Sequence, residues 1–166
     1  MMHPIIKFYL DQEIACDRFD FNAMLTIPKP VIGDGYFYIA WLFPTDQPSK
    51  WNHREGFFTQ EDIDYFRNNE IIQQRFLQAF DFIIDYFSLY RKDDQLYAKE
   101  SLKNQQYWLR NIGHESKKIS RIIYSLWLCG QPELARNLQR IAIELGEEKG
   151  HIQEQTIGIW QSIIPS

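Results

Sequence analysis

The feature that most constrains this chain is a regular apolar stripe near its middle. Large apolar side chains recur at intervals of four, four, three, four and three, at Ile72, Phe76, Phe80, Ile83, Phe87 and Tyr90. This spacing follows the period of an α-helix and not the two-residue period of a strand. Ile71, Ile84 and Tyr86 widen the stripe, so more than one side should be covered. The sequence predicts a long helix from about Glu70 to Tyr90.

A second apolar segment, Tyr38 to Pro44, lies between two glycines and a polar loop. It is far shorter than the roughly 20 apolar residues that span a bilayer. It is also too apolar for the open surface of a soluble monomer. We expect a buried helical segment that ends at Pro44. Residues 1–35 form an irregular N-terminal arm, in which residues 5–10 are either a short helix or extended.

Local signals mark several helix boundaries. Thr59 and Asp62 have the spacing of a capping box, and the pair at 68–69 is a plausible break after the short helix. Further on, Gly130 suits the left-handed residue that follows a helix, and Pro132 suits the first position of the next. The helices on either side of this turn should form an antiparallel hairpin.

The remaining segments continue the helical pattern. We expect the second hairpin helix to end at Gly146 and a last helix to occupy residues 151–164. Residues 91–95 form a charged connector, residues 97–110 are weakly helical, and no strand alternation is found. The sequence predicts an all-α, single-domain helical bundle of about five to seven helices over residues 1–166, with the irregular N-terminal arm.

Composition narrows the function classes. The hydrophobic share of 45% and the aromatic share of 16% are too high for a disordered chain. A net charge of −4 argues against nucleic acid or an anionic membrane as partner. No signal peptide or transmembrane run is found. Cys16 and Cys129 lack metal-type spacing, so we expect free thiols in a reducing compartment. Without a signal peptide or apolar span, the expected location is cytoplasmic, and no cofactor is predicted.

Four polar residues share one face of the helix predicted after Gly113: His114, Lys118, Arg121 and Ser125. A positive stripe near a helix start suits a small anion or a peptide carboxylate. The alternative interpretation is a solvated face, with Arg121 bridging to a neighbouring helix. No metal-binding pair, nucleophile elbow, phosphate loop or dinucleotide fingerprint accompanies the stripe.

Two motifs carry a resemblance to a known family. The first is Tyr38-Ile39-Ala40-Trp41-Leu42-Phe43-Pro44 with Pro48, Ser49 and Asn52, and the second is His114 with Lys118-Ile119-Ser120-Arg121-Ile122-Ile123, Ser125, Leu126 and Gly130. In this order they resemble the conserved domain of the opioid growth factor receptor family. Tyr36 and Ala40 replace the histidine and glutamine of the family's first motif, and Glu115 and Lys118 replace the asparagine and arginine of its second.

The resemblance implies a helical domain whose vertebrate members are receptors for the opioid peptide methionine-enkephalin and act at the nucleus. This sequence resembles the bare domain that bacterial members have, without an import signal or repeat tail, so the nuclear role is not expected to transfer. The resemblance supplies no catalytic residue. We therefore predict a non-enzymatic binding domain for a peptide, a protein or a small anion, with a site formed by His114, Lys118, Arg121, Ser125 and Trp41.

Two other functions stay open. The first is an enzyme that uses His114 as acid–base with Glu115 or a distant carboxylate. The second is a nucleic-acid-associated protein with a local basic face, at Arg110, Lys117, Lys118 and Arg121, although the net negative charge disfavours it.

Overall fold

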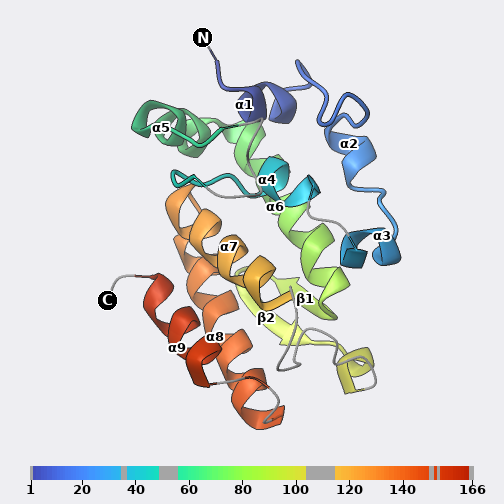
Figure 1. Ribbon diagram of the computed structural model, residues 1–166, viewed down its shortest axis with the longest axis vertical. Coiled ribbons are helices and arrows are strands. Elements are labelled where there is room, and N and C mark those ends of the chain that lie inside the picture. Colours follow the sequence, from blue (N-terminus) through green and yellow to red (C-terminus); the bar gives the residue numbers. More distant parts are fainter. Residues whose placement is uncertain are drawn as a thin grey trace. The chain divides into compact units, whose positions relative to one another are not determined.

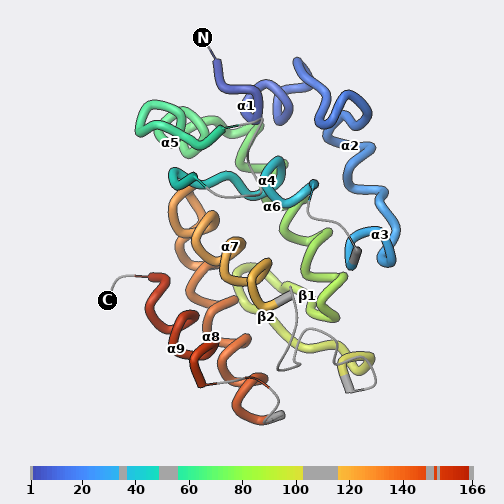
Figure 2. Tube along the Cα trace, in the orientation of Figure 1, coloured from blue at the N-terminus to red at the C-terminus, as the bar shows by residue number. Residues whose placement is uncertain are grey.

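Helices dominate the computed structural model, which describes residues 2–34, 37–48, 56–103, 115–149, 152 and 154–164 (Figures 1 and 2). Within these residues there are nine α-helices, one 3-10 helix and a two-stranded sheet. The mainly α-helical class is confirmed, but the expected absence of strands is wrong. The chain divides into two compact units, Met1–Ile83 and Ile84–Ser166. Each is described by itself.

The N-terminal arm is more helical than expected. It contains short helices and leads into longer ones: α1 (Pro4–Tyr9), α2 (Phe21–Met24), α3 (Lys29–Asp34), α4 (Phe37–Leu42), α5 (Gln60–Asn68) and α6 (Glu70–Tyr86). At the start of α1, the His3 imidazole Nδ1 accepts a hydrogen bond from the Ile5 amide at 3.1 Å. Pro4 follows at the first helical position, where it needs no amide hydrogen. Of the two conformations left open for residues 5–10, the helix is the one observed.

Helix α4 is the buried segment that the sequence predicted. Residues 38–43 are all buried, and the helix stops before Pro44. A buried tyrosine needs a partner for its hydroxyl, and Tyr9 Oη donates to the Leu42 carbonyl at 2.6 Å. The Tyr9 ring also lies 4.9 Å from Phe21 and 5.0 Å from Phe66. An aromatic core therefore joins α1, α2, α4 and α5.

Helix α5 begins with the expected capping box. Thr59 Oγ1 accepts from the Asp62 amide at 3.3 Å, and Asp62 Oδ2 accepts from the Thr59 amide at 2.9 Å. The predicted break is also confirmed. The helix ends at Asn68, and Asn69 Oδ1 accepts from the Ile72 amide at 3.0 Å, which starts α6.

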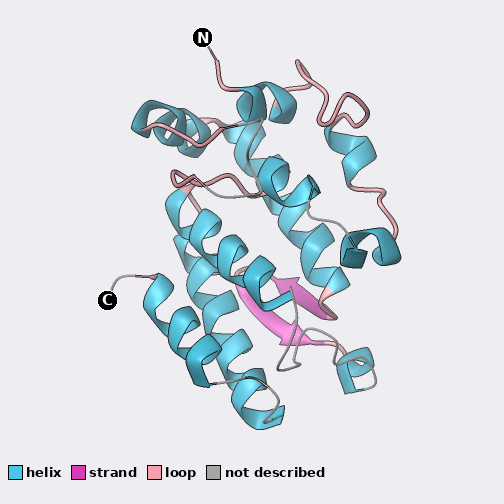
Figure 3. Cartoon of the chain, viewed as in Figure 1, coloured by secondary structure: helices cyan, strands magenta, loops and turns pink. Residues whose placement is uncertain are grey.

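Helix α6 ends at Tyr86, four residues earlier than the stripe predicted. Ser88 has a positive φ of 60°, and the chain continues into a hairpin of β1 (Leu89–Lys92) and β2 (Gln95–Ala98) (Figure 3). Leu89 and Leu96 are buried, whereas the paired Tyr90 and Tyr97 are exposed. This period of two is a strand pattern in segments only four residues long.

The hairpin corrects two further expectations. The charged segment at 91–95 is part of the sheet and its turn, in which Asp93 has a φ of 53°. Residues 97 and 98 belong to β2, and the 3-10 helix Glu100–Lys103 follows. The rest of the predicted helical segment, 104–110, lies outside the described residues.

Three helices complete the C-terminal unit: α7 (Glu115–Leu128), α8 (Pro132–Lys149) and α9 (Glu154–Ile163). The tight turn between α7 and α8 is confirmed, because Gly130 has a φ of 115° and Pro132 starts the next helix. Gly146 does not end α8, which continues to Lys149. A Cβ at Gly146 would meet Ile152 Cγ1 at 3.3 Å and Trp160 Cζ3 at 3.5 Å. The glycine therefore permits close packing of α9 against α8 (Figure 1).

Candidate functional site

The predicted polar stripe lies on α7, and its described members are buried. Lys118 and Ser125 have no exposed surface, and Arg121 is 8% exposed. His114 lies outside the described residues. The interpretation of these three residues as a solvated face is therefore wrong. The apolar residues on the other side of α7 are buried as well, so this helix is covered on both sides.

The surroundings of Lys118 fit an interior position. Its Nζ lies 5.9 Å from the centroid of the buried Tyr86 ring, within range of a cation–π contact. On the opposite side of α7, the Ser120 hydroxyl donates to the Ser116 carbonyl at 3.0 Å and accepts from Trp160 Nε1 at 3.1 Å. These bonds attach α9 to α7. Lys118 has no exposed surface, so a ligand can reach it only if the residues that cover it move.

Trp41, the predicted site residue of the first motif, lies on α4 in the N-terminal unit. It is 7% exposed, and its ring packs edge-on against Phe8 with 5.4 Å between ring centroids. Its indole Nε1 is buried and has no hydrogen-bond partner within the described residues. The structure thus brings Lys118, Arg121 and Ser125 together on α7 and places Trp41 in the other unit.

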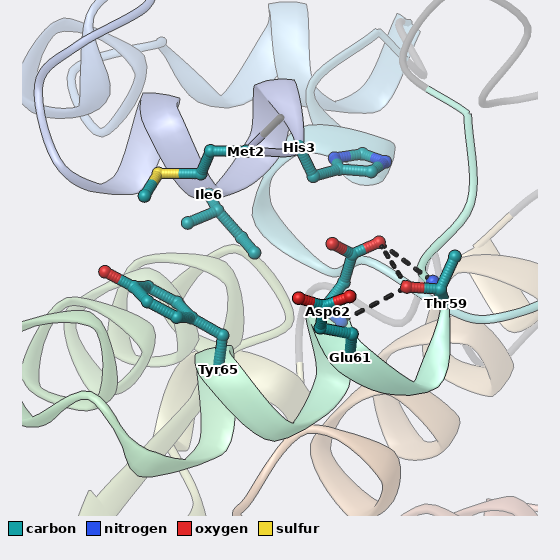
Figure 4. Close-up of a pocket in the computed structure, with 7 residues that line it drawn as sticks. All are labelled: Met2, His3, Ile6, Thr59, Glu61, Asp62 and Tyr65. Atoms are coloured by element: carbon teal, nitrogen blue, oxygen red, sulfur yellow. Dashed lines mark hydrogen bonds between the residues drawn. The ribbon is translucent and has the colours of Figure 1, made fainter.

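An accessible site occurs elsewhere, between the start of α1 and the first turns of α5. This pocket has a volume of about 510 Å³ and is lined by Met2, His3, Ile6, Thr59, Glu61, Asp62 and Tyr65. Figure 4 shows the side chains of Met2, Ile6 and Tyr65 gathered on one side of the pocket, with the two carboxylates nearby. We call it the α1–α5 pocket.

Helix caps hold much of the polar side of the α1–α5 pocket in place. Asp62 Oδ2 accepts from both the amide and the hydroxyl of Thr59, at 2.9 and 3.1 Å. His3 is fixed by its bond to the Ile5 amide and by an edge contact with Phe58 at 4.8 Å. These polar groups are preorganised, because they serve helix starts that exist without a ligand.

Glu61 and Tyr65 are the adaptable part of the α1–α5 pocket. Both are exposed, and Tyr65 keeps 42% of its surface accessible. Within the described chain, Glu61 has no hydrogen-bond or ion-pair partner. A charged carboxylate beside exposed apolar side chains can bind a cationic group that carries an apolar stem. Such a pocket suits binding.

Sequence reasoning found the capping box but not the pocket that it helps to form. The pocket joins residues 2–6 to residues 59–65, and no spacing rule connects segments so far apart. Residues 49–55 of the polar loop before α5 lie outside the described part of the chain. The exposure of Met2 and Tyr65 indicates a binding surface, but it is visible only in the structure and not in the sequence.

The described residues contain no group of three His, Cys, Asp or Glu side chains that could hold a metal ion. None of the described helices is long and apolar enough to cross a membrane.

Comparison with known proteins identifies the family. The model of the opioid growth factor receptor conserved region matches residues 30–164, most of the chain. The chain belongs to this family. Over 118 residues it is 25% identical to the opioid growth factor receptor of Homo sapiens and 23% identical to those of Mus musculus and Rattus norvegicus. No solved structure matches it significantly.

The alignments with these three relatives cover only part of each protein. The alignments cover 69% of this chain but 17% of the human receptor, 18% of the mouse receptor and 20% of the rat receptor. The α5 side of the α1–α5 pocket lies inside the family region, whereas Met2, His3 and Ile6 precede it. The pocket is therefore built partly from the family region and partly from residues before it.

Proposed function

We propose that this chain is a non-enzymatic binding domain, and that its ligand is a peptide or a segment of another protein bound at the α1–α5 pocket. The pocket itself carries the proposal, because three apolar side chains there share an open hollow with two carboxylates. Ligand sites combine an apolar wall with a few placed polar groups in this way. Membership in a family whose relatives are named receptors supports a binding role.

The small anion predicted from the α7 stripe has less support than the peptide. A Lys118 without exposed surface cannot meet an anion at the surface of the folded unit. A ligand role for Lys118, Arg121 and Ser125 stays a prediction, as does the acid–base role of His114. The test below separates these residues from the α1–α5 pocket.

Amide NMR spectra of the isotope-labelled protein, titrated with methionine-enkephalin and a panel of short peptides, test the proposal. We expect the amide shifts to concentrate at residues 2–6 and 59–65. Tyr65→Ala should weaken binding about three- to tenfold, as expected for loss of an aromatic contact. Tyr97→Ala is the matched control, because Tyr97 is also 42% exposed but lies in the C-terminal unit. Shifts confined to α7, or equal weakening by both variants, would contradict the pocket assignment.

A further inference from the structure

A second hollow lies directly beside the α1–α5 pocket. It has a volume of about 430 Å³ and is lined by Glu61, Asp64, Tyr65, Asn68 and Asn69. Glu61 and Tyr65 line both hollows and are four residues apart, so they lie one above the other on α5. They form a ridge between the two hollows. A ligand that crosses this ridge can fill both.

The charge around the ridge has one sign. Glu61, Asp62 and Asp64 line the two hollows, and no Lys or Arg among the described residues lines either of them. Residues 1–83 contain seven Lys and Arg against twelve Asp and Glu, a formal charge of −5, whereas residues 84–166 contain eleven against ten, a charge of +1. The N-terminal unit as a whole therefore attracts cations, and the three carboxylates that line the two hollows add to this attraction locally.

The three carboxylates are not equally free to bind. Asp62 is held by Thr59, and Asp64 Oδ1 accepts from Gln60 Nε2 at 3.0 Å. Only Glu61, of the three, has no partner within the described chain. It lies next to the exposed Tyr65 ring, so the ridge offers a carboxylate and an aromatic face together. Both groups favour a cation with an aliphatic stem.

We propose that the ridge and its two hollows bind a basic, partly apolar segment of another protein, with a lysine or arginine side chain of that segment at Glu61. The aliphatic stem of this side chain lies against Tyr65 and Met2 in the α1–α5 pocket. A neighbouring apolar side chain of the same segment fills the second hollow, on the other side of the ridge. An acidic segment would be repelled, and a purely apolar one would desolvate Glu61 without replacing its water contacts. This inference rests on the proposed function, because it names the ligand chemistry of the same pocket.

Three acetylated and amidated peptides of one length provide the test. They share two leucines in a background of glycine and serine, and they differ only at two positions, which carry lysine, glutamine or glutamate. A fourth peptide is the glutamine version with a free amino terminus. Binding is followed from the amide shifts of residues 59–69. We expect the lysine peptide to bind tightest, and its affinity to fall when NaCl rises from about 20 to about 300 mM.

Variants of Glu61 identify the charge that is responsible. Glu61→Gln should weaken the lysine peptide about two- to fivefold, the usual size of an exposed ion pair. Glu148→Gln is the control, because it removes the same charge from an exposed position on α8. Glu61→Lys should reverse the preference and favour the glutamate peptide. Neither substitution touches the capping box, and thermal unfolding of each variant checks that the fold is retained.

The outcomes separate this inference from the proposed function. If the glutamine peptide shifts the same residues with equal affinity, the basic-segment inference is wrong and the peptide-binding function stands. If only the free amino terminus binds, the cation is a chain end and not a side chain, which also overturns the inference. If no peptide shifts residues 2–6 or 59–69, both proposals fail together.

Discussion

Gly146 lies inside α8, and its replacement by alanine sets two opposite effects against each other. Alanine in place of glycine in a helix interior stabilises by about 1 kcal/mol, because the unfolded chain loses conformational freedom. At this position the new methyl group would lie 3.3 Å from Ile152 Cγ1, 3.4 Å from Ile152 Cβ and 3.5 Å from Trp160 Cζ3. These are contacts with two side chains, both of which are buried.

The neighbours determine which effect is larger. Ile152 Cγ1 would be closer than an ordinary van der Waals contact, so this buried side chain would have to shift by a few tenths of an ångström, whereas Trp160, held by Ser120, lies at an ordinary contact distance. Overpacking of this kind costs about 1–3 kcal/mol. Adding the gain in helix preference to the cost of overpacking, we expect Gly146→Ala to change the free energy of unfolding by between zero and a loss of about 2 kcal/mol.

Gly158 on α9 is the matched control, because a Cβ there would meet nothing within 4 Å. Gly158→Ala should show the helix preference alone and stabilise by about 0.5–1 kcal/mol. Urea unfolding of the two variants, followed by circular dichroism, measures both changes. An equal gain at the two positions would refute the reasoning, since it would mean that Ile152 does not pack closely against Gly146.

Two further predictions concern charged side chains. Asp11 accepts a hydrogen bond from Arg75 at 2.7 Å, which lowers the pKa of this carboxyl below its ordinary value of 3.8. The ion pair contributes under about 1 kcal/mol to the free energy of unfolding, because it is so exposed. This contribution is complete above pH 3.8 and is lost as the pH falls through the lower pKa of the folded state. In urea unfolding, the stability difference between the wild-type protein and Asp11→Asn should therefore vanish in strong acid, and a difference that stays constant with pH would contradict this. Lys118→Ala should destabilise by about 2 kcal/mol or more, because a buried stem is deleted, whereas the exposed neighbour Lys117→Ala should cost less than about 0.5 kcal/mol by thermal unfolding. If Lys118→Ala were as stable as the wild-type protein but no longer bound peptide, the result would support the ligand site predicted on α7.

Local rules predicted the parts of this fold that local physics determines. The capping box at Thr59, the break at Asn69 and the turn at Gly130 each depend on a few neighbouring residues, and all three are observed. The β-hairpin was missed because its strands have four residues each. The stripe that predicted a helix to Tyr90 includes two residues beyond the observed end of α6, Phe87 and Tyr90, which happen to continue the period.

Burial is the quantity that the sequence could not supply for the candidate site. Angular spacing correctly placed Lys118, Arg121 and Ser125 on one face of α7, but it cannot say what packs on that face. Charged residues are usually exposed unless they are paired, so both interpretations of the stripe, a ligand site and a solvated face, assumed exposed side chains. The prediction that Gly146 ends a helix was wrong for a related reason. The sequence does not distinguish a glycine that permits close packing inside a helix from a glycine that ends one.

The origin of the two sides of the α1–α5 pocket bears on how its ligand would be selected. Glu61 and Tyr65 lie within the matched family region, whereas Met2 and Ile6 precede it. The charge and the aromatic face would then come from the family region, and the opposite apolar side from α1. Relatives that keep the α5 residues but change the segment before the family region would retain a preference for charge and differ in the apolar side chain that they accept. A pocket with one side inside the family region and the other outside it allows ligands to diverge while the helical framework stays the same.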